Sequence, residues 1–107
     1  MAATLEHNIT SVLTKDLLVA GDGINNVKSI TLSNVDSSND AFVDLILNKL
    51  NNNYYILKNV LIPQGATLVL GPQDNIVFDN SLGGFSLRIK VDDGSTTAVN
   101  VDVIIKR

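Results

Sequence analysis

The sequence contains no cysteine and no tryptophan, and its 107 residues include a single histidine, His7. The absence of cysteine excludes a disulfide framework, a thiolate zinc site and a cysteine nucleophile. One histidine also excludes most acid–base and metal-binding constellations, which combine imidazoles or pair one with a carboxylate. His7 lies near the start of the chain with only Glu6 beside it, so we interpret it as a solvated side chain.

Positive charge and long apolar runs are scarce as well. Eight Lys and Arg residues stand against eleven Asp and Glu residues, which gives a formal net charge of −3. This balance argues against nucleic acid or an anionic membrane as a partner. No apolar run approaches the roughly 18 residues of a membrane span, and residues 1–7 lack the basic and apolar regions of a signal peptide. We therefore expect synthesis in a cytoplasm and no nucleic-acid or membrane partner.

β-Branched residues are abundant, and strong helix formers are few. Val, Ile and Thr supply 29 residues, whereas Glu6 is the only glutamate. Several runs alternate apolar and polar residues with the period of two that is typical of a half-buried antiparallel strand. The runs with this alternation, or with a short β-rich composition, are 17–20, 28–33, 41–48, 54–58, 67–70, 75–78, 85–91 and 99–105.

Turn residues separate these runs at the intervals that are typical of an all-β sandwich. No helical pattern lies between them, which argues against an α/β fold. The sequence predicts an all-β protein with a single antiparallel β-sandwich, jelly-roll or immunoglobulin-like, of about seven or eight strands. Residues 1–107 form this one domain, and residues 1–10 are interpreted as a flexible or partner-bound arm.

The last two strands carry the clearest alternation in the chain. One row of alternate residues is apolar in each, and both rows are expected to face the core and to pair antiparallel. The residues 92–95 are predicted to join them as a hairpin, since Asp-Asp-Gly is a turn sequence. The two rows are Phe85, Leu87, Ile89 and Val91, and Val99, Val101, Val103 and Ile105.

The carboxylates offer candidates for chemistry, and each has a simpler structural interpretation. Calcium needs six to eight oxygen ligands, whereas the loop 36–40 supplies about three or four and Asp92 and Asp93 supply only a pair. Glycoside chemistry needs one carboxyl group with a raised pKa in an apolar pocket, whereas Asp44 and Asp102 occupy outward positions of strands. We expect no catalytic residue, no metal site and no cofactor.

A ligand platform is the remaining alternative. The adjacent residues Tyr54 and Tyr55 could stack on a sugar, so a small carbohydrate-binding β-sandwich module stays open as a second function, and the accessory domain of a small hydrolase as a third. The Gly83-Gly84 pair has no lysine or helix after it and therefore forms no phosphate loop.

Apolar residues also occupy positions that face away from the predicted core. Phe42 and Ile46 alternate against the apolar row of their strand, and Tyr54 and Ile56 do the same on the following strand. Same-face residues on adjacent antiparallel strands lie close enough to form one patch, and an exposed apolar patch marks an interface. We predict that Phe42, Ile46, Tyr54 and Ile56 form an interface. Val69, Val77 and Ile104 are outward apolar residues of the same kind.

Three stretches together resemble small virion structural proteins of tailed bacteriophages, most closely those of marine cyanophages and related phages. They are 27–34, 43–47 and 54–70. The end of the chain is similar too, with an Ile-Val-Phe strand, a turn of small residues, Leu-Arg-Ile-Lys-Val and a terminal Val-Asp-Val strand. The likeness covers about residues 27–105 and is a pattern of strands and turns, with no catalytic signature.

The resemblance implies a non-enzymatic β-sandwich that decorates a capsid or sits on a neck or tail. Such proteins are usually trimers or larger symmetric sets, so a homo-oligomer, with a trimer favoured, and contacts with other phage capsid or tail proteins are expected. The location implied is the virion, after assembly in the host cytoplasm. Residues 1–26 do not match this pattern.

Overall fold

The computed structural model describes residues 4–19, 27–49, 51–71 and 86–106, and these residues form strands and turns without a helix. Eight strands are present in this part of the chain. They are β1 (Thr4–Ile9), β2 (Lys15–Leu18), β3 (Ser29–Asn34), β4 (Ala41–Lys49), β5 (Asn52–Ile62), β6 (Thr67–Leu70), β7 (Ser86–Asp92) and β8 (Val101–Lys106). The predicted strand at 75–78 lies outside the described residues.

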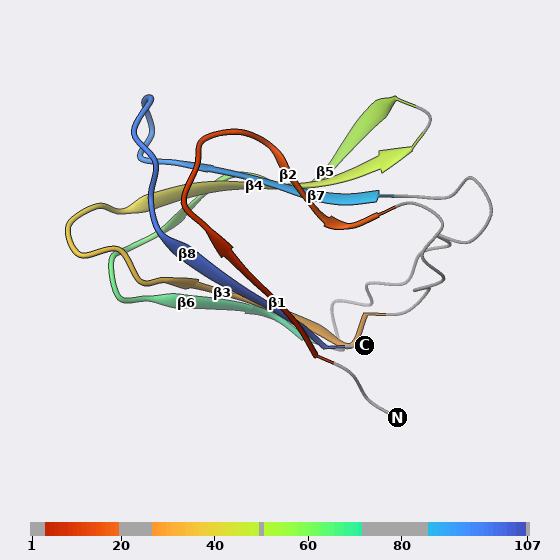
Figure 1. Ribbon diagram of the computed structural model, residues 1–107, viewed down its shortest axis with the longest axis horizontal. Helices are drawn as coiled ribbons and strands as arrows, with labels where there is room; N and C mark the ends of the chain where they lie inside the picture. Colours follow the sequence, from red (N-terminus) through yellow and green to blue (C-terminus); the bar gives the residue numbers. More distant parts are fainter. Residues whose placement is uncertain (1–3, 20–26, 50, 72–85, 107) are drawn as a thin grey trace.

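The strands form two antiparallel sheets that pack face to face (Figure 1). Sheet A has the order β1-β8-β3-β6, and sheet B has the order β2-β7-β4-β5. β1 pairs with β8, β2 with β7, β3 with β6 and β4 with β5. The chain therefore folds back on itself as one long double ribbon that rolls into two sheets. This connectivity is that of a jelly roll, so the predicted fold class is confirmed.

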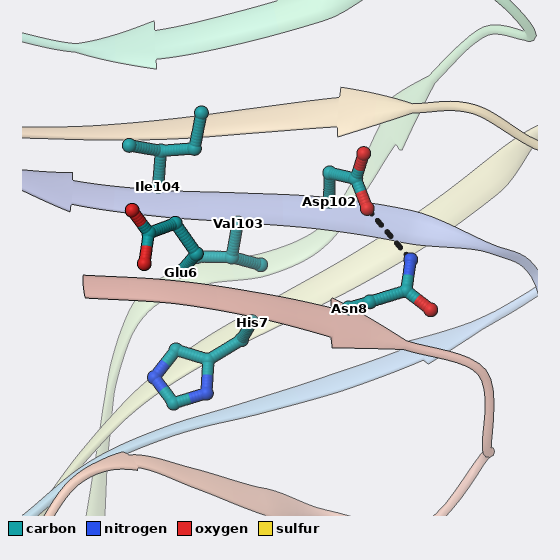
Figure 2. A pocket seen from close by; sticks show the side chains of 6 residues that line it. All are labelled: Glu6, His7, Asn8, Asp102, Val103 and Ile104. Atoms are coloured by element: carbon teal, nitrogen blue, oxygen red, sulfur yellow. Dashed lines mark hydrogen bonds between the residues drawn. The ribbon is translucent and has the colours of Figure 1, made fainter. Parts of the chain in front are cut away.

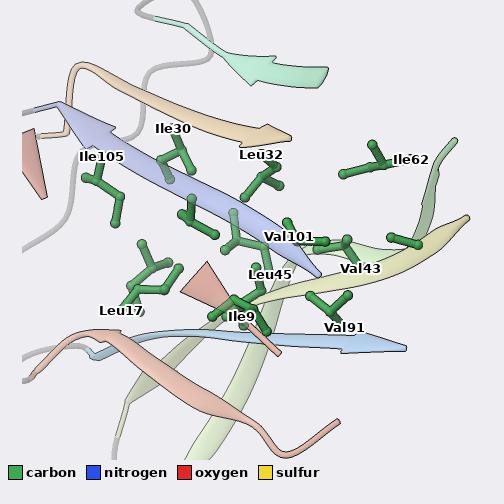
Figure 3. Close-up of a cluster of buried hydrophobic side chains, with 14 of the residues drawn as sticks. Ile9, Leu17, Ile30, Leu32, Val43, Leu45, Ile62, Val91, Val101 and Ile105 are labelled. Atoms are coloured by element: carbon green, nitrogen blue, oxygen red, sulfur yellow. The ribbon is translucent and has the colours of Figure 1, made fainter. Parts of the chain in front are cut away.

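The core lies between the sheets and is made by the inward residues of both. In β3 the alternation is strict, because Ile30 and Leu32 are fully buried while Ser29, Thr31 and Ser33 are only partly covered. Figure 3 shows Ile30, Leu32 and Ile105 pointing toward Val43, Leu45 and Val91 from the other sheet. Burial of this kind contributes about 25 cal/mol per Å² of apolar surface and is the main source of stability.

The last two strands do not pair with each other, which corrects the sequence prediction. β7 lies between β2 and β4 in sheet B, and β8 lies between β1 and β3 in sheet A. Residues 93–100 carry the chain from one sheet to the other instead of closing a hairpin. The described members of both rows do face the core. Alternation sets which face of a strand is buried, and it does not specify the neighbouring strand.

The start of the chain is also different from the prediction. Residues 4–9 are the edge strand β1 of sheet A, paired along their whole length with β8, rather than an arm. Ile9 is buried in the core, and Leu5 packs against it from the rim. Two inward apolar residues in six form a weak alternation, and Glu6, His7 and Asn8 conceal it in the sequence.

β5 contains two irregularities opposite β4 that change the register. Val43 pairs with Val60 and Leu45 with Leu57, so one extra residue of β5 is accommodated between them. A second extra residue, Ile56, follows because Ile46 pairs with Tyr55. Each is a β-bulge, which bends the strand and increases its twist. The end of the β4–β5 hairpin consequently stands away from the body of sheet B (Figure 1).

Candidate functional site

The four residues predicted as an interface do not share one face. Tyr54 and Ile56 are exposed, at 55% and 37%, but Ile46 is only 3% exposed and Phe42 is partly buried. Opposite Ile46 the register places Tyr55, while Tyr54 pairs with Leu47 on the side that faces the core. The prediction that the four residues share one face is therefore wrong, because the bulges in β5 shift its side-chain alternation relative to β4. That they belong to an interface stays a prediction.

A signal for the first bulge was present in the sequence and was missed. Asn59 adopts a positive φ of 55°, a conformation that asparagine tolerates better than most residues. Its backbone N–H donates a hydrogen bond of 2.7 Å to Asp44 Oδ1 across the strand pair. Asp44 therefore holds the irregular backbone of β5 and is a structural carboxylate, as its outward position suggested.

The exposed end of the β4–β5 hairpin carries three large apolar or aromatic side chains, and we call it the hairpin tip: Lys49 and residues 51–56. It carries Tyr54, Tyr55 and Ile56, at 55%, 47% and 37% exposure. Lys49 and Lys58 are the only charged residues between Leu45 and Gly71. The hairpin thus combines two lysines with exposed tyrosines in a chain of net charge −3, and aromatic residues are enriched at protein–protein interfaces.

The two tyrosines do not form a common platform for a sugar. They are successive residues of β5, and successive side chains of a strand point to opposite faces. The ring of Tyr55 also has a cation over it, because Lys58 Nζ lies 4.4 Å from the ring centroid. The same Nζ atom lies 3.6 Å from Asp44 Oδ2. Stacking of a ligand on that face of Tyr55 would require Lys58 to move away from the ring.

The outer face of sheet B carries charges that are paired within the chain. Arg88 Nε lies 2.8 Å from Asp16 Oδ1, a contact between charges without the alignment of a hydrogen bond. Lys90 Nζ donates to Asp92 Oδ2 at 2.9 Å. That hydrogen bond raises the pKa of Lys90 and lowers the pKa of Asp92. In the register, Ile46 lies between Tyr55 and Arg88, and its burial on this face follows from their cover.

The outer face of sheet A has a different composition, with short hydroxyl residues between scattered apolar and charged ones. Its middle row across the four strands is Glu6, Ile104, Thr31 and Val69. The next row is Asn8, Asp102, Ser33 and Thr67. Val69 is 56% exposed and Ile104 is 36% exposed, as their outward positions in the sequence indicated. The outward residue Val77 lies outside the described residues.

Polar contacts connect neighbouring strands within the second row. Asn8 Nδ2 donates to Asp102 Oδ1 at 2.6 Å and to Asn100 Oδ1 at 2.6 Å. Ser33 Oγ and Thr67 Oγ1 are 3.0 Å apart and share a hydrogen bond. Figure 2 shows the Asn8–Asp102 bond and places Asp102 and Ile104 on the same side of the β8 ribbon. These bonds link β1 to β8 and β3 to β6 across the outer face.

A shallow cavity of about 380 Å³ lies along β1 and β8, and it contains the single histidine. Its lining residues are Glu6, His7, Asn8, Asp102, Val103 and Ile104. His7 points away from the two carboxylates (Figure 2), and its Nε2–H donates to the Leu17 carbonyl of β2 at 3.1 Å. His7 is thus a bridge between the edge strands of the two sheets, which corrects its interpretation as a solvated side chain.

In the oxygen-rich loop at 36–40, the carboxylate of Asp36 is hydrogen-bonded to backbone N–H groups. Asp36 Oδ1 accepts from Asn100 N at 3.1 Å, and Asp36 Oδ2 accepts from Ser38 N and Asn39 N. The bond from Asn100, followed by those from Ser38 and Asn39, lowers the pKa of Asp36. Within the described residues, no group of three His, Cys, Asp or Glu side chains could hold a metal ion.

A buried polar junction lies beside this loop, and sequence reasoning did not find it. Asn34 is 2% exposed at the end of β3. Its Nδ2 donates to the carbonyls of Asn39 and Ile62, and its Oδ1 accepts from Asp36 N. The junction ties sheet A to the end of β5 in sheet B. One of thirteen asparagines carries this role, and only its inward position on β3 distinguishes it.

Comparisons with known proteins give a fold likeness of low similarity. No protein-family model matches the chain, and no curated protein matches it by sequence. Among solved structures, the mitogen YPM from Yersinia pseudotuberculosis is similar at a TM-score of 0.48 and 15% identity, covering 98% of this chain and 84% of that one. A chain of the T13 IBDV viral particle is similar at 0.39 and 7% identity, covering 99% of this chain and 30% of that one. At these TM-scores neither likeness bears on function.

In the part of the chain that the structure describes, no helix has the length and apolar character needed to cross a membrane.

Proposed function

We propose that this protein is a non-enzymatic structural component of a tailed-phage virion, either a capsid decoration or a neck or tail accessory. The observation that carries the proposal is the hairpin tip, where Tyr54, Tyr55 and Ile56 stand exposed on a projection from a rigid jelly roll. Tyrosines at such a position are frequent interface anchors. The resemblance of residues 27–105 to virion structural proteins supports the same conclusion.

The described side chains favour assembly over chemistry or ligand binding. Asp36 and Asp44 accept hydrogen bonds from backbone N–H groups, and Asp92 accepts one from Lys90. Tyr54 and Tyr55 diverge, which weighs against the carbohydrate-binding alternative. We propose that the protein acts by self-association and by docking on other capsid or tail proteins, in a virion assembled in the host cytoplasm. The resemblance favours a trimer as the symmetric set.

The experiment is to look for the protein in purified particles and to alter the hairpin tip. Mass spectrometry of gradient-purified virions should detect the chain in stoichiometric amounts. Particles that carry the Tyr54→Ser, Ile56→Ser double variant should lose most of it, since two anchor side chains are removed.

Leu13→Ser is the matched control, because Leu13 is 74% exposed in the β1–β2 connection and lies outside the tip. This variant should be incorporated normally. A chain that is absent from wild-type particles would overturn the proposed function. Full incorporation of the double variant would show that the tip is not the docking element.

A further inference from the structure

Strand β8 presents a self-complementary pattern on the outer face of sheet A. Alternate residues point to the same side, so Asp102, Ile104 and Lys106 form a line of acid, apolar residue and base. Neighbours in this line are about 6.8 Å apart, twice the rise per residue of an antiparallel strand. When a second copy of this line runs in the opposite direction, its base faces the acid of the first copy and its acid faces the base.

From this pattern we propose that two copies of the chain associate through the outer faces of sheet A, about a two-fold axis that passes by Ile104. The inference rests on the proposed function, since it names one surface through which the protein self-associates. Reversing the direction of β8 in the partner brings each Asp102 opposite Lys106 of the other copy. Ile104 then meets its own equivalent, as an isologous contact requires.

The rest of the face fits a second sheet. Thr31 and Val69 continue the row of Ile104 across β3 and β6. Of the apolar side chains in this row, that of Val69 is the most exposed. Ser33 and Thr67 are short and bonded to each other, so no long side chain stands between the two backbones there. Faces of this kind pack about 10 Å apart in β-sandwiches.

Charge distribution favours sheet A over sheet B for this contact. On sheet B, Asp16, Asp44 and Asp92 already face Arg88, Lys58 and Lys90 of the same chain. On sheet A, Asp102 is oriented by an uncharged partner, Asn8. None of the ion pairs among the described residues involves Asp102, and Lys106 of a second copy supplies a cation at the matching position.

The size of the face sets the strength of the contact. Four strands and three rows span about 15 Å by 14 Å, or roughly 300–400 Å² for each copy with side-chain margins. A stable interface buries about 800 Å² per partner, so this dimer should have a Kd on the order of 100 μM. Glu6 approaches its own equivalent at the rim, and Glu6→Gln should therefore tighten the dimer. A weak two-fold contact suits a particle, where neighbours are held at high local concentration.

The test is a charge exchange followed by sedimentation velocity from about 20 μM to about 1 mM, a range that brackets this affinity. Asp102→Lys and Lys106→Asp each place two like-charged pairs in the dimer, one on either side of the axis, and should lower the association constant about tenfold or more. The double variant restores both pairs with opposite polarity and should return to within about threefold of wild type. Thermal melting by circular dichroism verifies that each variant is folded.

Lys15→Asp, an equal change of charge on the exposed start of β2, is the matched control and should leave association unchanged. The proposal is supported only if association returns in the double variant. A double variant as weak as the singles, a monomer at 1 mM, or a trimer insensitive to both reversals would overturn it. Detection of the chain in virions is independent of these outcomes, so the proposed function can survive the loss of this interface.

Discussion

The two sheets of this jelly roll have equivalent inner faces and very different outer faces. The central strands of both sheets carry fully buried Val, Ile and Leu residues on their inner sides, such as Leu32 and Val103 in sheet A and Val43 and Ile89 in sheet B. Outside, sheet B pairs its charges within the chain, as in Asp16–Arg88 and Lys90–Asp92. Sheet A instead has a central line of acid, apolar residue and base on β8, beside the short hydroxyl residues of β3.

This difference shows that core packing restricts the residue types on the inner side of each strand. The residues on the outer side are not restricted in this way and can serve other roles, such as assembly. On the outer face of sheet B, the paired acidic and basic side chains neutralise one another within the chain. Ile46 is buried on the same face. Among the described residues, Asp102 on the outer face of sheet A has no such pair, and the pattern of this face is completed by a second copy under our proposal. The predictions below test the contrast between inner and outer residues, and then the contrast between the two faces.

Val101→Asp should have the largest effect. Val101 is fully buried on the inner side of β8, and an unpaired charge there costs several kcal/mol from a total stability of about 5–15 kcal/mol. The variant should be unfolded by circular dichroism. Ile104→Asp, three residues along β8 on the outer side, is the control and should melt cooperatively near wild type. A folded Val101→Asp protein would contradict the assignment of faces.

Asn34→Ala should have the next largest effect, because it breaks the junction between the two sheets. The substitution removes three hydrogen bonds and leaves the buried Ile62 carbonyl without its side-chain donor. A loss of about 2–4 kcal/mol in the free energy of unfolding is expected, measured by urea denaturation. Asn53→Ala, which removes one exposed bond to Asn48, should cost less than about 0.5 kcal/mol. Equal losses would show that the junction is not specially stabilising.

Asp36→Asn should change the acid dependence of stability. Backbone N–H donors, first that of Asn100, hold the pKa of Asp36 below its ordinary value of 3.8. The stabilisation is therefore complete above that ordinary value and is lost as the pH falls through the lower pKa of the folded chain. Urea midpoints between pH 7 and pH 2.5 should decline less steeply for Asp36→Asn than for wild type. Parallel curves would rule out this carboxylate as a source of acid sensitivity.

Breaking an ion pair on the outer face of sheet B should have the smallest effect. Asp16→Asn removes the partner of Arg88, but both side chains are more than a third exposed, at 47% and 37%. Such pairs contribute about 0–1 kcal/mol. A double-mutant cycle with Arg88→Gln should give a coupling energy in that range and no change in association. A change in oligomeric state would contradict the view that sheet B pairs its charges internally.

The fold class and most of the core were predictable from the sequence, because alternation and burial are local properties of a strand. Ile30, Leu32 and Val101 follow this rule. Strand pairing was not predictable, since β7 and β8 are consecutive in the chain and lie in different sheets. The strand β1 was also missed, because its inward residues Leu5 and Ile9 are separated by three polar ones.

The candidate surface was predicted in part. Tyr54 and Ile56 are exposed on the hairpin tip, although Tyr54 lies opposite Leu47 and not beside Ile46 as alternation suggested. Ile46 lies on the outer face as predicted but is covered there, and the two extra residues in β5 bring Tyr55 instead of Tyr54 opposite it. Bulges depend on the partner strand as well as on the bulged one, so only Asn59 gave a local indication. The complementarity of Asp102 and Lys106 could be recognised only once the register of β8 with β1 and β3 was known.

The most direct test of the contrast between the two outer faces is a dilution series followed by methyl NMR of Ile and Val side chains. Between about 1 mM and about 20 μM, where a weak dimer dissociates, the resonances of Ile104 and Val69 on sheet A should shift together, and Ile46 on sheet B should stay fixed. Shifts of Ile46 with fixed resonances of Ile104 and Val69, or no shifts at all, would contradict association through the outer face of sheet A.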